Sequence, residues 1–145
     1  VTNGAIAGIL DKIGEGLPNE TISDIYGATA GLSGIVEGRI IDLGEVKRKT
    51  IENLRRTPGS VLSGRYRFLS EDDGPALIAA LRKYEIGTLF LLGGLPAIEL
   101  AKFTLEAAKK EDFEINVLVV PLSPENEVGA GDHCPGYGSA ARAAA

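Results

Sequence analysis

LFLLGGLPAIEL, residues 89–100, is the stretch that decides the fold. An apolar run ends at Gly93 and Gly94, and a helical pattern begins directly after Pro96. Two glycines between a buried strand and a helix N-terminus let backbone N–H groups approach an anion, which favours a nucleotide, pyrophosphate or sugar phosphate as ligand. An ordinary tight turn would explain the same glycines. Since no Walker lysine follows, a classical P-loop is excluded.

Helical and strand patterns alternate on both sides of this stretch. Apolar spacing predicts helices at residues 2–14, 45–56, 72–84 and 97–110, and a final helix from residue 139. Apolar runs predict strands at 21–28, 39–43, 88–92 and 116–120, with a short strand within 60–68 and a glycine-rich turn over 31–38. This alternation predicts an α/β fold, a Rossmann-like three-layer sandwich with a largely parallel sheet and helices on both faces.

The first predicted helix begins at the very start of the sequence. Thr2 or Asn3 would cap it, and Ile6, Ile9, Leu10 and Ile13 share its apolar face. A parallel sheet normally supplies a strand just before such a helix. We therefore expect one domain over residues 1–145 that lacks its first strand and is incomplete at both ends.

The amino-acid composition limits the classes of partner that the protein could bind. The formal net charge is −5 and the isoelectric point is about 4.9, which argues against nucleic acid and anionic membranes. No apolar run approaches the roughly 20 residues that a membrane span needs. Cys134 is the single cysteine and no signal-peptide pattern opens the sequence, so we expect a cytoplasmic location.

Three loops should meet at the carboxyl ends of the strands: residues 93–97, 121–128 and 129–138, with 63–67 as a candidate fourth. The second carries Ser123, Glu125, Asn126 and Glu127. Alternate positions of an extended loop point the same way, so a hydroxyl and two carboxylates could form a general base beside a metal or phosphate. A solvated acidic loop is the alternative.

Basic and nucleophilic residues add weaker candidates. Arg65 and Arg67 could clamp an anion, because a guanidinium matches phosphate oxygens. The other basic residues of 47–56 fit the exposed face of a helix. His133 and Cys134 lack a third group that would orient the imidazole, so the glycines around them are better explained as shaping a loop.

Four motifs in order resemble the phosphofructokinase family, and specifically its phosphoryl-donor half. They are TNGAIAGI (2–9), IYGATAGLSGIVEGRIIDL (25–43), GSVLSGR (59–65) and DHCPGYGSAAR (132–142). The last has the form associated with pyrophosphate-dependent or mixed bacterial members. The resemblance covers essentially all 145 residues. It implies a cytoplasmic glycolytic kinase or transferase that passes a phosphoryl group from ATP or pyrophosphate to fructose 6-phosphate, usually as a homo- or hetero-oligomer, with a second, sugar-binding domain outside this sequence.

The resemblance also implies roles for single residues. Arg65, Gly93 and Gly94 match the family's donor-phosphate arginine and paired phosphate-loop glycines. Ser123 and Asn126 match substrate-binding positions of its "TIDND" motif. Glu125 matches the aspartate that serves as catalytic base, and Glu127 matches the second aspartate of the motif, so the resemblance implies that both are catalytic residues.

The sequence departs from the family's motifs at positions that bind the metal ion and that select the phosphoryl donor. Leu95 replaces the aspartate that helps hold Mg²⁺ on the donor phosphates, so no metal ligand is expected at this position and Mg²⁺ binding is in doubt. Leu122 and Pro96 replace residues that distinguish ATP from pyrophosphate in the family. Glu125 carries one methylene more than aspartate, and a displacement of about 1 Å can lower a rate on the order of 10²-fold.

Three functions are therefore considered. The first is a phosphofructokinase-like donor domain with weak or no activity of its own. The second is a non-catalytic regulatory or assembly subunit that keeps the fold. The third is an unrelated Rossmann-like protein that binds an adenine nucleotide.

Overall fold

Strands β3 (Thr88–Gly93) and β4 (Asn116–Pro121) pair in parallel, and helix α5 (Leu95–Lys110) connects them and packs against both. Parallel neighbours need a crossover connection of this kind. The computed structural model describes residues 1–14, 22–63, 68–129 and 132–145. Within them, the βαβ unit confirms the predicted α/β class.

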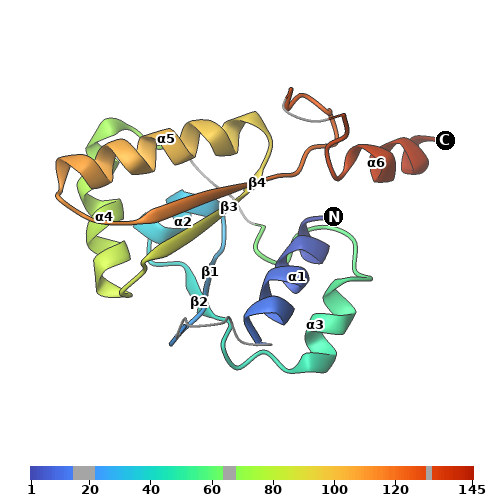
Figure 1. Ribbon diagram of the computed structural model, residues 1–145, viewed down its shortest axis with the longest axis horizontal. Helices are drawn as coiled ribbons and strands as arrows, with labels where there is room; N and C mark the ends of the chain where they lie inside the picture. Colours follow the sequence, from blue (N-terminus) through green and yellow to red (C-terminus); the bar gives the residue numbers. More distant parts are fainter. Residues whose placement is uncertain (15–21, 64–67, 130–131) are drawn as a thin grey trace.

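The remaining elements surround this unit (Figure 1). Strands β1 (Tyr26–Ala28) and β2 (Ile40–Asp42) form a second pair, which is antiparallel. The helices are α1 (Thr2–Gly14), α2 (Gly31–Val36), α3 (Arg48–Leu54), α4 (Gly74–Lys83) and α6 (Tyr137–Ala144), and the 3₁₀ turn η1 (Glu71–Asp73) precedes α4.

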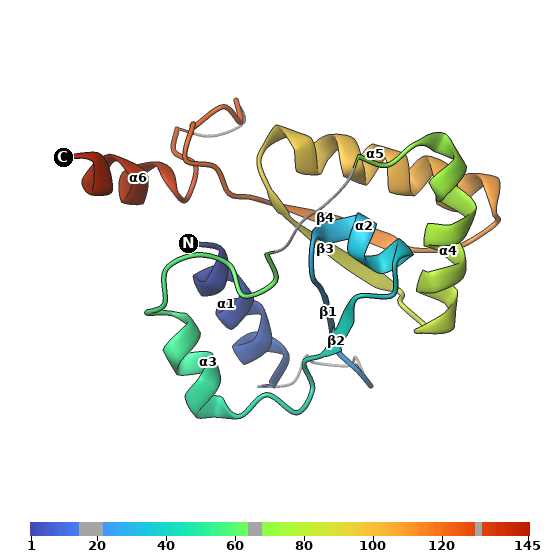
Figure 2. The same ribbon diagram turned by 180° about the vertical axis from the view of Figure 1, so that it is seen from behind.

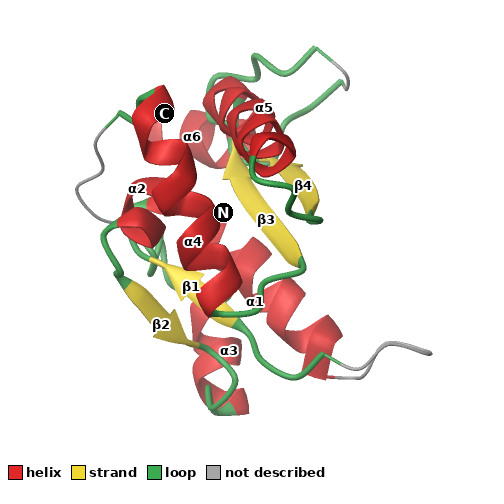
Figure 3. Ribbon diagram, turned by 90° about the vertical axis from the view of Figure 1, so that its left-hand side faces the viewer, coloured by secondary structure: helices red, strands yellow, loops and turns green. Residues whose placement is uncertain are grey.

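The strands lie between two groups of helices. Helices α4 and α5 pack together on one side, and α1 and α3 pack together on the other (Figures 1 and 2). Figure 3 shows β1 between β2 and the region of α1 and β3. Helix α6 lies at the edge of the molecule in both ribbon views.

The core joins α2, α4, α5 and β3. Leu77, Ile78 and Leu81 of α4 are at most 1% exposed. Helix α5 meets them with small side chains, and a Cβ added to Gly74 would lie 3.3 Å from the Cβ of Ala107. Small residues on facing helices therefore set the close approach of α4 to α5.

Several local predictions were wrong. Residues 31–36 form a helix instead of a turn. Residues 60–63, expected to start a strand, hold no strand, and residues 61–62 form a turn. The apolar spacing of the helix predicted over 97–110 gives an inward face of Ile98, Ala101, Leu105 and Ala108. Leu105 is instead 48% exposed, because α5 turns Thr104 and its alanines toward the core. The predicted strand 21–28 shortens to β1, and residue 21 lies outside the described residues.

Asn3 was expected as a candidate cap for the first helix, and it has another role. It lies inside α1 and is 2% exposed. Its Nδ2 donates to the carbonyl of Thr57 at 3.1 Å, and its Oδ1 accepts from the N–H of Val61 at 2.6 Å. This side chain therefore fastens α1 to the segment that follows α3.

Candidate active site

Three loops meet at the N-terminus of α5. The segment after β4 contacts the turn after β3, because the Leu122 N–H donates to the Gly93 carbonyl at 3.1 Å. It also pairs with the loop before α6 through the Ser123 N–H and the Pro135 carbonyl, 3.0 Å apart, in a bridge between Ser123 and Gly136. This is the meeting of loops that the strand pattern predicted. Of the fourth candidate loop, residues 64–67 lie outside the described residues.

Ser123 and Glu127 form the centre of the site. Ser123 is 3% exposed and its hydroxyl donates to Glu127 Oε2. The other carboxylate oxygen of Glu127 accepts from the backbone N–H of Leu95 at 3.3 Å. The Glu127 carboxylate therefore caps the first turn of α5, where the helix dipole and unpaired N–H groups favour a negative charge.

Hydrogen bonds lower the pKa of Glu127 below its usual value of 4.5. The hydrogen bond from the Ser123 hydroxyl lowers the pKa most, and the backbone N–H of Glu127 itself comes next. Partial desolvation raises the pKa, and the Leu95 N–H lowers it by a smaller amount. Donors that stabilise the charged form favour ionisation. The carboxylate is thus held as an anion at neutral pH.

Gly94 makes this arrangement possible. A Cβ on Gly94 would lie 2.0 Å from Glu127 Oε1 and 3.3 Å from the Ser123 Cβ. The φ angle of Gly94 is −82°, so the glycine is needed for space and not for a left-handed backbone. Gly93 ends β3, and its own added Cβ would lie 3.3 Å from the Ala97 Cβ.

The loop after β4 turns back on itself, which contradicts the expected extended geometry. The Glu125 N–H donates to the Ser123 hydroxyl at 3.1 Å, and Asn126 has a left-handed φ of 55°. A serine hydroxyl that accepts from the N–H two residues on stabilises such a turn. Ser123 and Glu127 meet, as expected, but through a turn, and the Glu125 side chain is exposed.

Asn126 joins two loops. Its Oδ1 accepts from the backbone N–H of Cys134 at 2.6 Å, and Cys134 itself is 4% exposed. The neighbouring His133 ring lies edge-on to Tyr137, with centroids 6.0 Å apart. The amide of Asn126 therefore positions the loop before α6, and its proposed role with substrate stays a prediction.

Arg65, the predicted phosphate clamp, lies outside the described residues. The described part of the site does not fit a magnesium ion. Leu95 offers no oxygen from its side chain, and both carboxylate oxygens of Glu127 are already engaged. Within residues 1–14, 22–63, 68–129 and 132–145, no cluster of three His, Cys, Asp or Glu side chains is placed to hold a metal.

Sequence reasoning missed that Glu127 would reach the N-terminus of α5. The spacing of Glu127 behind a proline and a serine was visible, but the turn at Asn126 that directs the carboxylate was not.

None of the described helices has the length and apolar character that crossing a bilayer requires.

Parallel strands with their carboxyl-end loops gathered at a helix N-terminus define an α/β protein of the Rossmann-like class. The family model described as Phosphofructokinase matches residues 3–145. This chain therefore belongs to the phosphofructokinase family.

Curated relatives and solved structures agree with this family. A "Sulfofructose kinase" of Alkalicoccus urumqiensis is 34% identical over 124 residues, which cover 82% of this chain and 31% of that protein. A "Pyrophosphate--fructose 6-phosphate 1-phosphotransferase" of Rhodospirillum rubrum is 30% identical over 118 residues, covering 81% and 29%. The structure of a pyrophosphate-dependent phosphofructokinase from Nitrosospira multiformis has a TM-score of 0.86 at 25% identity, covering 95% of this chain and 34% of that one. The chain thus spans about a third of the length of these relatives.

Proposed function

We propose that this chain is the donor-binding part of a phosphotransferase that passes a phosphoryl group from pyrophosphate or ATP to fructose 6-phosphate, and that the chain itself turns over weakly or not at all. The observation that carries the proposal is the meeting of the loops after β3 and β4 at the N-terminus of α5, in a member of the phosphofructokinase family. The names of the relatives above supply the reaction class.

The donor phosphates would approach Gly94 and the first turn of α5. Backbone N–H groups at a helix N-terminus bind anions without a side chain, and the absence of a Cβ on Gly94 leaves the approach open to any group that replaces the Glu127 carboxylate. Glu125, exposed on the adjacent loop, would act as general base on the sugar hydroxyl. Arg65 would add positive charge from the segment after residue 63.

Two features support weak activity. Leu95, at the first position of α5, presents an apolar side chain that is 48% exposed where the family resemblance implies a metal-binding carboxylate. Phosphoryl transfer depends largely on positioning and on neutralising the phosphate charge. In addition, Glu127 places a carboxylate at the N–H that a phosphate oxygen would use.

A coupled assay with fructose 6-phosphate and either donor tests the proposal. We expect little turnover by the native chain, and Leu95→Asp should strengthen Mg²⁺-dependent binding of pyrophosphate in calorimetry. Leu105→Asp is the matched control, because Leu105 is also an exposed leucine of α5, at 48%, but lies far from its N-terminus along the helix. Equal titrations for the two variants would contradict the assignment of this loop, and rapid turnover by the native chain would contradict the weak activity.

The contact between Glu127 and Leu95 favours a second candidate, a non-catalytic regulatory or assembly subunit. A carboxylate already seated at the anion position stabilises the empty fold and competes with a donor. This candidate predicts that neither ATP nor pyrophosphate binds measurably to the native chain, even with Mg²⁺, and that the chain co-purifies with an intact catalytic subunit. Micromolar donor binding by a partner-free monomer would speak for the first candidate.

A further inference from the structure

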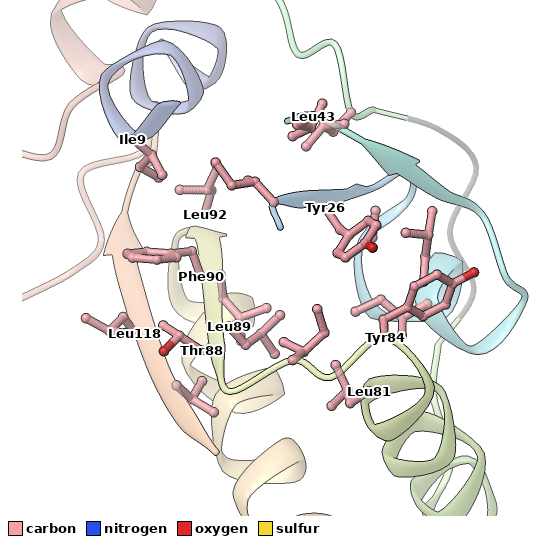
Figure 4. A pocket seen from close by; sticks show the side chains of 18 of the residues that line it. Ile9, Tyr26, Leu43, Leu81, Tyr84, Thr88, Leu89, Phe90, Leu92 and Leu118 are labelled. Atoms are coloured by element: carbon pink, nitrogen blue, oxygen red, sulfur yellow. The ribbon is translucent and has the colours of Figure 1, made fainter. Parts of the chain in front are cut away.

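A large apolar cavity of the molecule lies away from the loops of the candidate active site. Its volume is about 1080 Å³, and it is lined by α1, β1, β3 and the end of α4 (Figure 4). In the close view, Phe90 and Leu92 of β3 lie on one side of it, and Tyr26 of β1 lies on the other. No residue of the described loops after β4 lines it. The cavity therefore gives a ligand no access to the Ser123 hydroxyl, whose partners lie within the loops themselves.

The Ser123 hydroxyl has two partners in its own loop. It donates to Glu127 Oε2, and it accepts from the backbone N–H of Glu125 at 3.1 Å. An ionised carboxylate can only accept a hydrogen bond and a backbone N–H can only donate one, so these two partners fix the direction of the hydroxyl proton. The single proton of this hydroxyl is therefore committed to Glu127.

Burial keeps other partners away from the same hydroxyl. Ser123 is 3% exposed, and its backbone N–H donates to the Pro135 carbonyl at 3.0 Å. A Cβ added to Gly136 would lie 3.1 Å from the Ser123 carbonyl, and a Cβ added to Gly94 would lie 3.3 Å from the Ser123 Cβ. A substrate oxygen that took the hydroxyl proton would have to enter this packed space and would leave the Glu127 carboxylate with one donor fewer, which costs free energy.

The two hydrogen bonds of the hydroxyl belong to a longer series that ends at the N-terminus of α5. The Glu125 N–H donates to the Ser123 hydroxyl, and that hydroxyl donates to the Glu127 carboxylate. The other oxygen of the same carboxylate accepts from the Leu95 N–H at 3.3 Å. Hydrogen bonds that follow one another in this way strengthen each other. The backbone that carries the exposed Glu125 side chain is thus tied to Glu127 through one hydroxyl.

We propose that Ser123 is a positioning residue, whose hydroxyl holds Glu125 and Glu127 in one turn and does not bind substrate. This role differs from the substrate-binding role that the family resemblance implies for the same position. Ser123 acts together with the Glu127 carboxylate, which orients the hydroxyl proton and leaves the hydroxyl oxygen to accept from the Glu125 N–H. The consequence for phosphoryl transfer is a general base that is held in place on an exposed loop, and this consequence rests on the proposed function.

Amide hydrogen exchange of the whole chain, followed by NMR, tests the proposal. Ser123→Ala removes the acceptor of the Glu125 N–H, so the Glu125 amide should exchange at least about threefold faster. Ser123→Thr keeps the hydroxyl and should bring the exchange to within about twofold of the native rate. Ser33→Ala is the matched control, because Ser33 is 2% exposed and its hydroxyl donates to the Ala30 carbonyl, outside the site. This control should leave the Glu125 amide unchanged.

A second comparison separates positioning through Glu127 from a general loosening of the loop. Glu127→Ala removes the group that orients the Ser123 proton, so the Glu125 amide should exchange about threefold faster than in the native chain. With Ser123→Ala already present, the same substitution should change that rate by less than about 1.5-fold, because the link is already broken. The amide of the buried Leu81 in α4 is the reference for global unfolding. Ser123→Cys, whose thiol is a weak donor and acceptor, takes the place of Ser123→Ala if the alanine variant does not fold.

Two results would overturn the proposal. The first is an equal effect of Glu127→Ala on the Glu125 amide with and without the Ser123 hydroxyl. The second comes from titrating fructose 6-phosphate and pyrophosphate separately into the native and Ser123→Ala chains, where we expect the variant to bind neither more weakly. An affinity that falls about tenfold or more in Ser123→Ala, while the Glu125 amide keeps its native exchange rate, would assign the hydroxyl to substrate. Exchange at Glu125 requires neither donor nor turnover, so a failure of the proposed function would not change this result.

Discussion

Gly34→Ala should destabilise the protein strongly, because the added methyl group would clash with the backbone of Thr29. A Cβ on Gly34 would lie 1.8 Å from the Thr29 carbonyl oxygen and 2.9 Å from its carbon. Contacts of real Cβ atoms stay above about 3.0 Å, so backbone would have to move by about 1.2 Å. Thr29 follows β1, and the Gly34 carbonyl accepts from the Arg39 N–H at 2.7 Å, so the shift would disturb both strands of that pair.

Overpacking of a rigid site costs about 1–3 kcal/mol or more, and the obstructing group here is backbone, so we expect a loss of about 3 kcal/mol. For a chain of this size that corresponds to a fall in melting temperature of about 10 °C. Thermal unfolding followed by circular dichroism measures it. Gly8→Ala is the control, because Gly8 lies in α1 with nothing within 4 Å of an added Cβ, and there alanine should stabilise by about 0.5–1 kcal/mol. Equal melting temperatures for Gly34→Ala and the native chain would refute the reasoning.

Three further predictions concern the core, the first helix and the site. Leu77→Ala removes a side chain that is 0% exposed and should lower the free energy of unfolding by about 2–5 kcal/mol in urea, whereas Leu105→Ala on the surface should change it by less than about 0.5 kcal/mol. Asn3→Ala should cost about 1–3 kcal/mol, because the part-buried hydrogen bonds of the Asn3 side chain to the Thr57 carbonyl and the Val61 N–H are lost, and faster exchange of the Val61 amide would report it. The lowered pKa of Glu127 means that its stabilising contribution is complete above the unfolded value near 4.5 and is lost as pH falls through the lower folded value. The Leu95 amide signal should therefore titrate with a midpoint below 4.5, and Ser123→Ala should move that midpoint upward; an unchanged midpoint would contradict the dominant role of the Ser123 hydroxyl.

The long elements were predictable because their apolar patterns are strong. The runs in 88–92 and 116–120 have strand length and lie on either side of a 3.6-residue pattern, which together predict two parallel strands and a crossover helix. All three are present, with boundaries shifted by at most two residues. The meeting of the loops followed from this topology without knowledge of any side chain.

Where prediction was wrong, tertiary contacts outweighed local pattern. The glycines of 31–38 are typical of a turn, yet Gly34 permits a helix to pack directly on the Thr29 carbonyl. Leu105 belongs to an apolar stripe by spacing, but the close approach of α4 selects the alanine side of α5. The position of the Glu127 carboxylate depends on a left-handed residue at 126, which sequence alone does not specify.

Because Cys134 is buried, the reactivity of its thiol depends on the conformation of the loop before α6. The chain has a single cysteine, so a thiol reagent modifies one defined position. Cys134 is 4% exposed, and its backbone N–H donates to Asn126 Oδ1, so a reagent could reach the thiol only if the backbone beside it moved. The rate of alkylation would therefore report any opening of this loop beside the site, and a phosphoryl donor that tightens the loops would slow the labelling.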